Sequence, residues 1–245
     1  MKVVAIIQAR MSSSRLPGKV LREICGKTML QRVVERVSMD ESLDRVVVAT
    51  TTTPDDDAIE QFCVSQGIDS FRGSLSDVLD RYHGAAEKYK ADSVVRITAD
   101  CPLADPVIID SVVRNFLSAE GQFDYYSNIN PPTYPDGLDT EVFSRQSLEV
   151  MWQEARLKSE REHVTLYIRN HPERFKIGNL TGELDLSRMR WTVDEPADLQ
   201  FVIGVYASFG EKKFGFKDVV GYLASHPELI ELNKGIIRDE GLLKS

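Results

Sequence analysis

Cysteine is scarce in this chain of 245 residues. The three that occur, Cys25, Cys63 and Cys101, are odd in number, lie far apart and form no Cys-x-x-Cys pair. Zinc sites and disulfide frameworks need cysteines at characteristic spacings, so the sequence argues against both. Unpaired cysteines are typical of a reducing compartment, and we therefore expect a cytoplasmic protein.

Long apolar runs and a surplus of positive charge are also absent. No stretch approaches the roughly 20 apolar residues that a membrane-spanning helix needs. The N-terminus leads directly into a predicted strand, without the pattern of a signal peptide. Acidic residues outnumber Lys and Arg by 38 to 30, which gives a formal net charge of −8 and a pI of about 5.1. Neither a membrane nor a nucleic acid is therefore an expected partner.

Short apolar runs alternate with amphipathic stretches along the whole sequence. With 42% hydrophobic and 28% charged residues the chain can bury a core, and its length fits one large domain over residues 1–245. We expect strands at 3–7, 45–50, 68–72, 93–98, 123–127, 138–143, 175–180 and 189–193. We expect helices at 27–37, 55–65, 77–89, 106–119, 144–155, 160–168, 195–209, 216–224 and 227–232. This order predicts a doubly wound α/β fold with a mostly parallel sheet, helices on both faces and a smaller elaboration around 125–161.

Capping residues mark several of the predicted helix starts. Ser76, Ser144 and Asp105, the last followed by Pro106, have side-chain oxygens that can accept the first backbone N–H groups. Residues 55–57 are three successive aspartates at another helix start. There we expect the acids to interact with the helix dipole and assign them no chemistry.

The stretch from Gln8 to Lys19 joins the first predicted strand to the first helix. It carries Arg10, Arg15 and Lys19, and no acidic residue occurs before Glu23. In open α/β sheets the loop after the first strand is a common phosphate site, and fixed cations attract a highly charged anion such as a triphosphate. An ordinary solvated loop is the alternative. The loop has neither the Walker A spacing nor Gly-x-Gly-x-x-Gly.

Asp100 follows the predicted strand at 93–98. Because Asp105 fills the capping role for the next helix, Asp100 has no evident structural task. Ligands of open α/β sheets bind at the carboxyl ends of the strands, and Mg²⁺ is usually held by one or two carboxylates together with phosphate oxygens. Asp100 is therefore a predicted magnesium ligand.

Residues 9–19 read Ala-Arg-Met-Ser-Ser-Ser-Arg-Leu-Pro-Gly-Lys. This stretch resembles the Ala-Arg-x-x-Ser-x-Arg-Leu-Pro-x-Lys signature of the cytidylyltransferases that make CMP-activated sugars, the group of the CMP-Kdo and CMP-sialate synthetases. It looks most like the SpsF-type spore coat polysaccharide biosynthesis proteins. Residues 99–103 are similar to that family's Gly-Asp-x-Pro-Leu metal motif, with Ala99 in place of glycine. Residues 194–199 resemble its Asp-x-Pro-x-Asp-Leu block.

The resemblance implies a fold of the nucleotide-diphospho-sugar transferase type, with CTP as substrate and Mg²⁺ as cofactor. Its implied metal ligands are Asp100 and Asp194, although Asp194 could instead cap the helix at 195–209. The implied catalytic residues are Arg10, Arg15, Lys19 and Asp100. The implied nucleotide contacts are Gln8, Ala9, Arg10, Ser14, Arg15, Lys19, Gly73, Ser74 and Asp77. A capped helix, with Asp77 paired to Arg81, is the alternative for the last three.

The resemblance also implies an acceptor-sugar pocket, formed by Tyr134, Asp136, Asp139, Glu141, Arg161 and His163. The alternating pattern over 138–143 places Asp139 and Glu141 on one strand face, and carboxylates suit hydroxyl-rich sugars because they accept hydrogen bonds. A solvent-exposed polar face is the alternative for that strand. Packing or capping is the alternative for His163.

The reaction that these features predict is transfer of CMP from CTP to a sugar, in particular a sugar acid, with release of pyrophosphate. The choice of cytosine follows from the resemblance, and Asp139 and Asp194 are the candidates for the general base. The resemblance also implies a homodimer and a role in surface or spore coat polysaccharide biosynthesis.

A nucleotide-sugar-dependent glycosyltransferase is one alternative, although such enzymes typically have Asp-x-Asp where this chain has Asp100 followed by Cys101. A nucleotide-binding protein without catalysis is the other.

Overall fold

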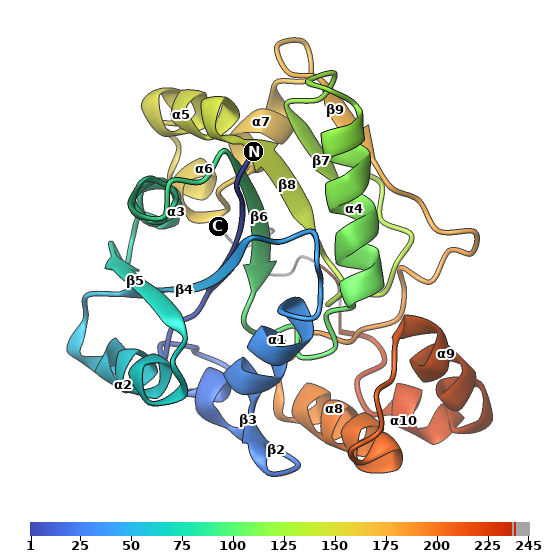
Figure 1. The fold of residues 1–245 in the computed structure, drawn as a ribbon. Coiled ribbons are helices and arrows are strands. Elements are labelled where there is room, and N and C mark those ends of the chain that lie inside the picture. The colour runs from blue at the N-terminus through green and yellow to red at the C-terminus, as the bar shows by residue number, and fades with distance from the viewer. Residues whose placement is uncertain (237, 239–245) are drawn as a thin grey trace.

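A seven-stranded sheet forms the centre of the structure, a computed structural model that describes residues 1–236 and 238 (Figure 1). Across the sheet the strands are β5 (Asp69–Gly73), β4 (Arg45–Thr51), β1 (Val3–Gln8), β6 (Ser93–Thr98), β8 (Glu141–Ser144), β7 (Tyr125–Ser127) and β9 (Ile177–Asn179). Neighbouring strands are parallel except at β8, which pairs antiparallel with β6 and β7. The predicted α/β class with a mostly parallel sheet is confirmed.

β1 lies between β4 and β6, where its composition requires it to be. Val3 to Ile7 are all buried, as expected of a parallel strand that is covered on both faces. The chain moves outward from β1 through β4 to β5 and returns on the other side of β1 as β6. This reversal is the topological switch point at which open α/β sheets bind ligands. Gln8 pairs directly with Thr98, so the segments after β1 and β6 start side by side.

Helices cover both faces of the sheet, as predicted (Figure 1). One apolar cluster joins Ala5 and Ile7 of β1 to α1 (Met29–Val37), α2 (Asp57–Gln66) and α4 (Pro106–Ser118). A second joins Val4 and Ile6 to α3 (Val78–Lys88), α5 (Arg145–Glu154) and α7 (Leu166–Asn170). Successive side chains of a strand point to opposite faces, so β1 alone contributes to both clusters.

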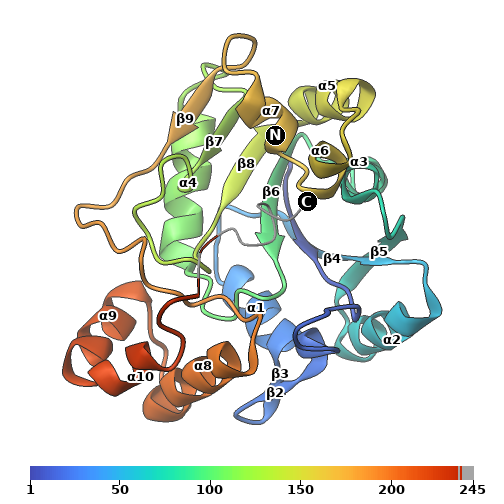
Figure 2. The ribbon, with the colours of Figure 1, turned by 180° about the vertical axis from the view of Figure 1, so that it is seen from behind.

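Three later helices gather at one end of the molecule, on the opposite side from α5 and α7 (Figure 2). They are α8 (Pro196–Phe209), α9 (Phe216–Ser225) and α10 (Pro227–Glu231). Their apolar residues form a third cluster with Trp191, and Ile24 of a small hairpin joins it. The hairpin consists of β2 (Glu23–Ile24) and β3 (Lys27–Thr28).

Two predicted helix starts are wrong because neighbouring residues make local structure of their own. The first helix begins at Met29, since the two preceding residues form β3 and Thr28 is the capping residue. Asp77, rather than Ser76, caps α3 by accepting the N–H of Asp80 at 2.9 Å. The predicted caps at Asp105 and Ser144 are confirmed.

The predicted helix over 160–168 is two short helices, α6 (Lys158–Glu162) and α7. Between them the backbone of Val164 has a φ of 54°, in the left-handed region that an α-helix cannot contain. The Val164 side chain is fully buried there. Burial of this apolar side chain is the interaction that offsets the unfavourable backbone geometry.

Four predicted strands are shorter than their patterns indicate. Those over 123–127 and 175–180 are reduced to β7 and β9, and the other two change more. Over 138–143 the strand begins only at Glu141, because the side chain of Asn128 bonds the backbone of Leu138 and Thr140 in place of a neighbouring strand. Over 189–193 there is a single bridge, between Arg190 and Asp136, and no ladder. This last segment is extended and fills the space between the sheet and α8.

The absences noted in the sequence agree with the structure. All three cysteines are free thiols, and burial raises the pKa of Cys63 to about 11. Among the described residues, no helix combines the length and the apolar character needed to cross a bilayer.

Asp105 connects α4 and α9 and provides a test of the fold. Its carboxylate accepts the N–H groups of Val107 (3.0 Å) and Ile108 (3.2 Å) on α4 and of Phe216 (2.6 Å) at the start of α9. We expect Asp105→Ala to lower the free energy of unfolding by about 2–3 kcal/mol, because a cap is lost and buried donors are left without an acceptor.

Urea unfolding measures this change, and Asp110→Ala is the matched control. Asp110 lies on the same helix but pairs with Arg114 at the surface. Exposed pairs of this kind contribute little to stability. Equal unfolding free energies for the two variants would contradict the structural role of Asp105.

Candidate active site

Two adjoining cavities of about 410 Å³ and 240 Å³ lie at the carboxyl ends of β1 and β6. The first is lined by the loop after β1, including the predicted contacts Gln8, Ala9, Arg10, Ser14, Arg15 and Lys19. The second is lined by the predicted acceptor residues Asp136, Asp139 and Glu141. Six residues line both: Arg15, Arg96, Thr98, Asp100, His163 and Asp194. The two cavities therefore adjoin each other at the topological switch point of the sheet.

The loop after β1 is held by hydrogen bonds to its backbone. Gly18 closes it, because its N–H donates to the carbonyl of Met11 at 3.0 Å and its φ of 67° is in the region that favours glycine. Lys19 then begins a short 3-10 helix, Lys19–Leu21. This closure directs the Lys19 side chain back toward the ends of the strands.

Asp56 has a role in this loop that the sequence did not reveal. It ends a 3-10 turn, Pro54–Asp56, and is 1% exposed. Its carboxylate accepts the N–H of Met11 at 2.7 Å and both the N–H and the hydroxyl of Thr51. It therefore attaches the loop after β1 to the end of β4. In the sequence it is one of three successive aspartates, and nothing there distinguishes it from a helix-dipole acid.

Lys19 joins the two aspartates that the sequence singled out. Its ammonium donates to Asp100 Oδ2 (2.7 Å), Asp194 Oδ1 (2.8 Å) and the carbonyl of Val193 (2.9 Å). Burial by itself would lower the pKa of Lys19, but the two carboxylates outweigh it and raise that pKa. Burial would likewise raise the pKa of Asp100, but Lys19 holds it down at about 2. Lys19 and Asp100 are therefore both charged near neutral pH.

Arg15 reaches the same point from the loop. Its Nη2 lies 3.0 Å from Asp194 Oδ1, and its Nε lies 3.7 Å from Glu195 Oε1. With 30% of its side chain exposed, it remains accessible from both cavities. The structure therefore brings Arg15, Lys19, Asp100 and Asp194 together, as the sequence predicted.

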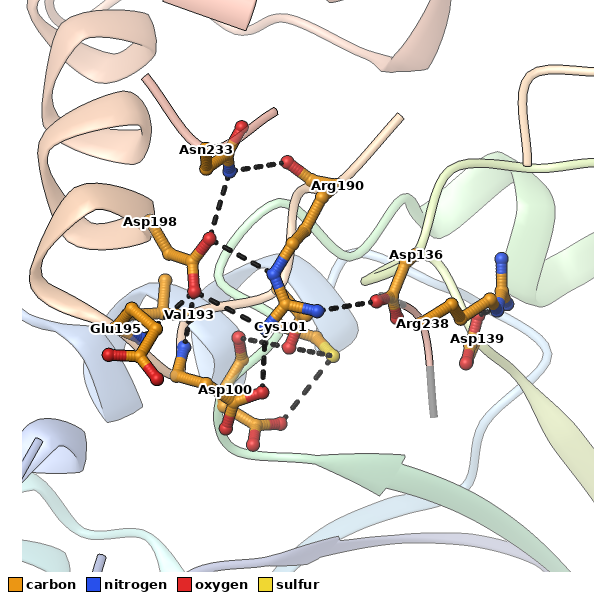
Figure 3. Close-up of polar contacts among 12 residues, drawn as sticks. Asp100, Cys101, Asp136, Asp139, Arg190, Val193, Glu195, Asp198, Asn233 and Arg238 are labelled. Atoms are coloured by element: carbon orange, nitrogen blue, oxygen red, sulfur yellow. Dashed lines mark hydrogen bonds and ion pairs between the residues drawn. The ribbon is translucent and has the colours of Figure 1, made fainter. Parts of the chain in front are cut away.

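Arg190 lies between Asp136 and Asp198 (Figure 3), and it also bonds to Asp194. Its guanidinium donates to Asp194 Oδ2 (2.8 Å), Asp136 Oδ2 (3.0 Å) and Asp198 Oδ1 (3.0 Å). Asp198, fully buried, accepts the N–H groups of Asp194 and Glu195, each at 2.9 Å. Asp198 therefore does the capping that was the alternative role for Asp194, and the Asp194 side chain faces Lys19 instead.

Glu141 lies at the floor of the second cavity and is 1% exposed. It forms an ion pair with Arg96 and accepts hydrogen bonds from the hydroxyls of Tyr125 and Thr165. Burial opposes its ionisation, but Arg96 and the other donors lower the pKa of Glu141. The alternative of a solvent-exposed strand face therefore does not hold for Glu141, which contributes a buried charge to the cavity wall.

Several predicted contacts lie away from both cavities. Gly73, Ser74 and Asp77 line neither, and Ser74 and Asp77 shape the start of α3. Asp77 also pairs with Arg161 at 2.5 Å, so the predicted Asp77–Arg81 pair gives way to a link between α3 and α6.

Tyr134 also lies away from the second cavity. It borders a separate groove and packs edge-on against Phe216.

Two arginines that the sequence did not mark as functional do line the cavities. Arg81, 2% exposed, lines the first and donates to the carbonyl of Ser74 at 3.0 Å. Arg169 lines the second. In each, the buried Nε has no hydrogen-bond partner in the described part of the chain. Both arginines lie in helices, where the sequence pattern does not distinguish a ligand contact from a solvated side chain.

The described residues contain no group of three or more His, Cys, Asp or Glu that could hold a metal alone. Asp100 and Asp194 both approach the single nitrogen of Lys19, so they are close enough to share one small cation. Any metal held there needs further oxygens from a ligand, which is the usual situation for Mg²⁺ with phosphates. Cys101 is adjacent, and burial raises the pKa of its thiol well above the usual range.

This chain is similar to a known protein family and to several known proteins. A family model described as cytidylyltransferase matches residues 4–211. The spore coat polysaccharide biosynthesis protein SpsF of Bacillus subtilis (strain 168) is 34% identical over 217 residues, which cover 86% of this chain and 88% of that protein.

Solved structures show the same fold. A cytidylyltransferase from Leptospira borgpetersenii serovar Hardjo-bovis (strain JB197) is similar with a TM-score of 0.92 and 36% identity, over 97% of this chain and 100% of that one. CMP:2-keto-3-deoxy-manno-octonic acid synthetase complexed with CTP is similar with a TM-score of 0.65 and 21% identity, over 85% of this chain and 99% of that one. At 21% identity, the similarity to this second structure concerns the fold alone.

The charged cluster around Lys19 can be tested without any ligand. We expect Lys19→Met to lower the free energy of unfolding by about 3 kcal/mol, because it leaves two partly buried carboxylates facing each other without their shared cation. In the double variant Lys19→Met/Asp100→Asn, part of that loss should be recovered, since one of the two charges is gone.

Chemical denaturation of the wild type, both single variants and the double variant gives the coupling energy. Strictly additive effects of the two substitutions would show that the Lys19–Asp100 contact does not contribute to stability.

Proposed function

This chain belongs to the cytidylyltransferase family and is a nucleotidyltransferase, and from that premise we propose that it makes a CMP-activated sugar. In the proposed reaction, a hydroxyl of a sugar acid displaces pyrophosphate from CTP in the presence of Mg²⁺. One observation carries the proposal. A cavity lined by a basic loop and a cavity lined by carboxylates meet at Asp100 and Asp194, and Lys19 bonds to both.

The first cavity suits the nucleotide. Its volume of about 410 Å³ is in the range of small-molecule sites. Arg10, Arg15 and Lys19 line it from the loop after β1, where they can bind the negative oxygens of a triphosphate. The buried Arg81 supplies a further donor for the same ligand. The assignment of CTP follows from membership in the family.

The second cavity suits an acidic sugar. Asp136 and Asp139 can accept hydrogen bonds from sugar hydroxyls. Arg169 presents a guanidinium whose buried Nε has no protein partner among the described residues, and a buried donor of this kind is stabilised by an anionic acceptor. We therefore propose that Arg169 binds the carboxylate of the sugar. His163 lies at the junction of the two cavities, where both substrates come together.

Catalysis in this arrangement is mainly positioning and charge stabilisation. Arg15 and Lys19 lie where the two cavities meet, so they can hold phosphate oxygens while the acceptor hydroxyl approaches phosphorus from the second cavity. Asp194 and Asp139, the two candidates for the general base, receive hydrogen bonds from Lys19 and Arg238 respectively. Both therefore hold cationic partners in the free protein.

We propose that Asp100 and Asp194 are the protein ligands of Mg²⁺. Their approach to a common point, and the absence of a larger ligand cluster among the described residues, fit an ion that takes its other oxygens from phosphate and water. When bound, the ion would neutralise charge on the phosphate oxygens. Lys19 and Arg190 would keep the two carboxylates in place around it.

The relative SpsF is named for spore coat polysaccharide biosynthesis, which supports a role for this chain in polysaccharide biosynthesis. The three free thiols support a cytoplasmic location. We further propose a homodimer, as in related synthetases, which light scattering in solution would test. The specific proposal of a spore coat role depends on the same relative.

Pyrophosphate release tests the proposed function. The protein is incubated with Mg²⁺, each nucleoside triphosphate in turn and a panel of sugar acids and neutral sugars. We expect release with CTP and a sugar acid only, complete loss on chelation of Mg²⁺, and at least a roughly 100-fold lower kcat for Asp100→Asn, since charge stabilisation at phosphorus is lost.

Asp185→Asn, a change at an exposed loop carboxylate, is the control and should keep wild-type kcat. Release of a nucleoside diphosphate from a sugar nucleotide would instead identify a glycosyltransferase. Nucleotide binding without turnover of any acceptor would identify a binding protein.

Arg169→Met tests the acidic group of the acceptor. We expect the KM for a sugar acid to rise about tenfold or more, because a charge-assisted hydrogen bond is lost, while the KM for CTP stays within about twofold. Steady-state kinetics with each substrate varied separately give both values. Arg174→Met, on a neighbouring arginine that pairs with Glu154 at the surface, is the matched control. A sugar-acid KM equal in the two variants would rule out the assigned role of Arg169.

A further inference from the structure

Two residues beyond the part of the chain that the family model matches, residues 4–211, bond to the acceptor side of the site. Arg238 donates from Nη2 to Asp139 Oδ1 at 2.5 Å and from Nη1 to the carbonyl of Tyr134 at 3.0 Å. These partners are about a hundred residues earlier in the sequence, in the segment that forms one wall of the second cavity. Only 15% of the Arg238 side chain is exposed, so the contact is largely enclosed.

Asn233 makes a second, independent connection. Its side-chain amide donates to the carbonyl of Arg190 (3.0 Å) and to Asp198 Oδ1 (2.9 Å), and it is 5% exposed. Arg190 in turn holds Asp136 of the same cavity wall. Figure 3 shows Asn233 and Arg238 on either side of this network, with Arg190 and Asp136 between them.

The charge on the cavity wall explains why Arg238 matters for an anionic acceptor. The second cavity is lined by five carboxylates, Asp100, Asp136, Asp139, Glu141 and Asp194, and by four arginines, Arg15, Arg96, Arg169 and Arg190. Asp100, Asp194, Asp136 and Glu141 each have a cation bonded to them from within this site. Arg238, which is not among the residues lining the cavity, supplies a cation for Asp139.

We propose that Arg238 is a positioning residue for acceptor selection: by neutralising Asp139 and fixing its orientation, it allows a negatively charged sugar to bind in the second cavity. Asn233 supports the opposite part of the same wall through Arg190. This inference rests on the proposed function, because it concerns which acceptors that site takes. It assigns acceptor selectivity to residues outside the part of the chain that the family model matches.

Full-length variants test the proposal by the kinetics of pyrophosphate release. In Arg238→Ala the KM for a sugar acid should rise about tenfold, with the KM for CTP changed less than about twofold, because Asp139 then repels the acceptor. Arg238→Lys should retain much of the wild-type KM, since the charge remains. In Arg238→Ala/Asp139→Asn the KM for a sugar acid should be lower than in Arg238→Ala, because the repelling charge is gone while the amide oxygen can still accept a hydrogen bond from a sugar hydroxyl.

Lys234→Ala is the matched control, since Lys234 lies between the two residues in the sequence but pairs with Glu231 at the surface. A wild-type sugar-acid KM in Arg238→Ala would overturn the proposal. So would a raised KM that Asp139→Asn does not correct, or equal increases in both KM values together with a lower melting temperature, which indicate a purely structural role. CTP-dependent pyrophosphate release by the wild type is measured separately, so failure of the proposed function is distinguished from failure of this inference.

Discussion

One ammonium group between two carboxylates determines the arrangement of the site. Lys19 lies at the end of the loop after β1, and its partners Asp100 and Asp194 are 81 and 175 residues later in the chain. A charge this deeply buried is unfavourable unless it is paired, so the fold must bring these three segments to one point. The loop, the end of β6 and the segment before α8 meet there for that reason.

The carboxylates of the second cavity are paired in the same way. Its wall contains carboxylates suited to sugar hydroxyls, and each must have a cation nearby if an acidic ligand is to enter. Arg190 supplies charge for Asp194, Asp136 and Asp198 together, and Arg96 does so for Glu141. Rigid groups of opposite charge, already bonded to one another, are the kind of preorganised environment that favours charge development in a reaction.

The fold provides the position for both cavities. β1 is central because it is apolar on both faces, and the chain returns beside it as β6 after β5. The carboxyl ends of β1 and β6 are therefore adjacent, so the loops that follow them start side by side at the switch point of the sheet. The antiparallel β8 brings Glu141 next to Arg96 of β6, which connects the acceptor wall to the same edge.

Sequence by itself determined the class of fold, most of its strands and helices, and the convergence of the basic loop with Asp100 and Asp194. The fold class, the strands and helices, the basic loop and Asp100 follow from local signals: apolar runs, capping residues and the residue order around a strand end. Asp194 followed from the resemblance of residues 194–199 to a block of the family. The sequence did not reveal Asp56, Arg81, Arg169, Arg190, Asn233 or Arg238, and it placed Gly73, Ser74 and Asp77 beside the nucleotide. The role of each of these residues depends on which side chain, distant in the sequence, becomes its hydrogen-bond or ion-pair partner. Asp198, for example, caps α8, and Asp194 therefore faces Lys19. Only the tertiary structure decides such pairings. A buried charge is stabilised by the group that packing brings within hydrogen-bond distance, and the local sequence around a residue does not identify that group.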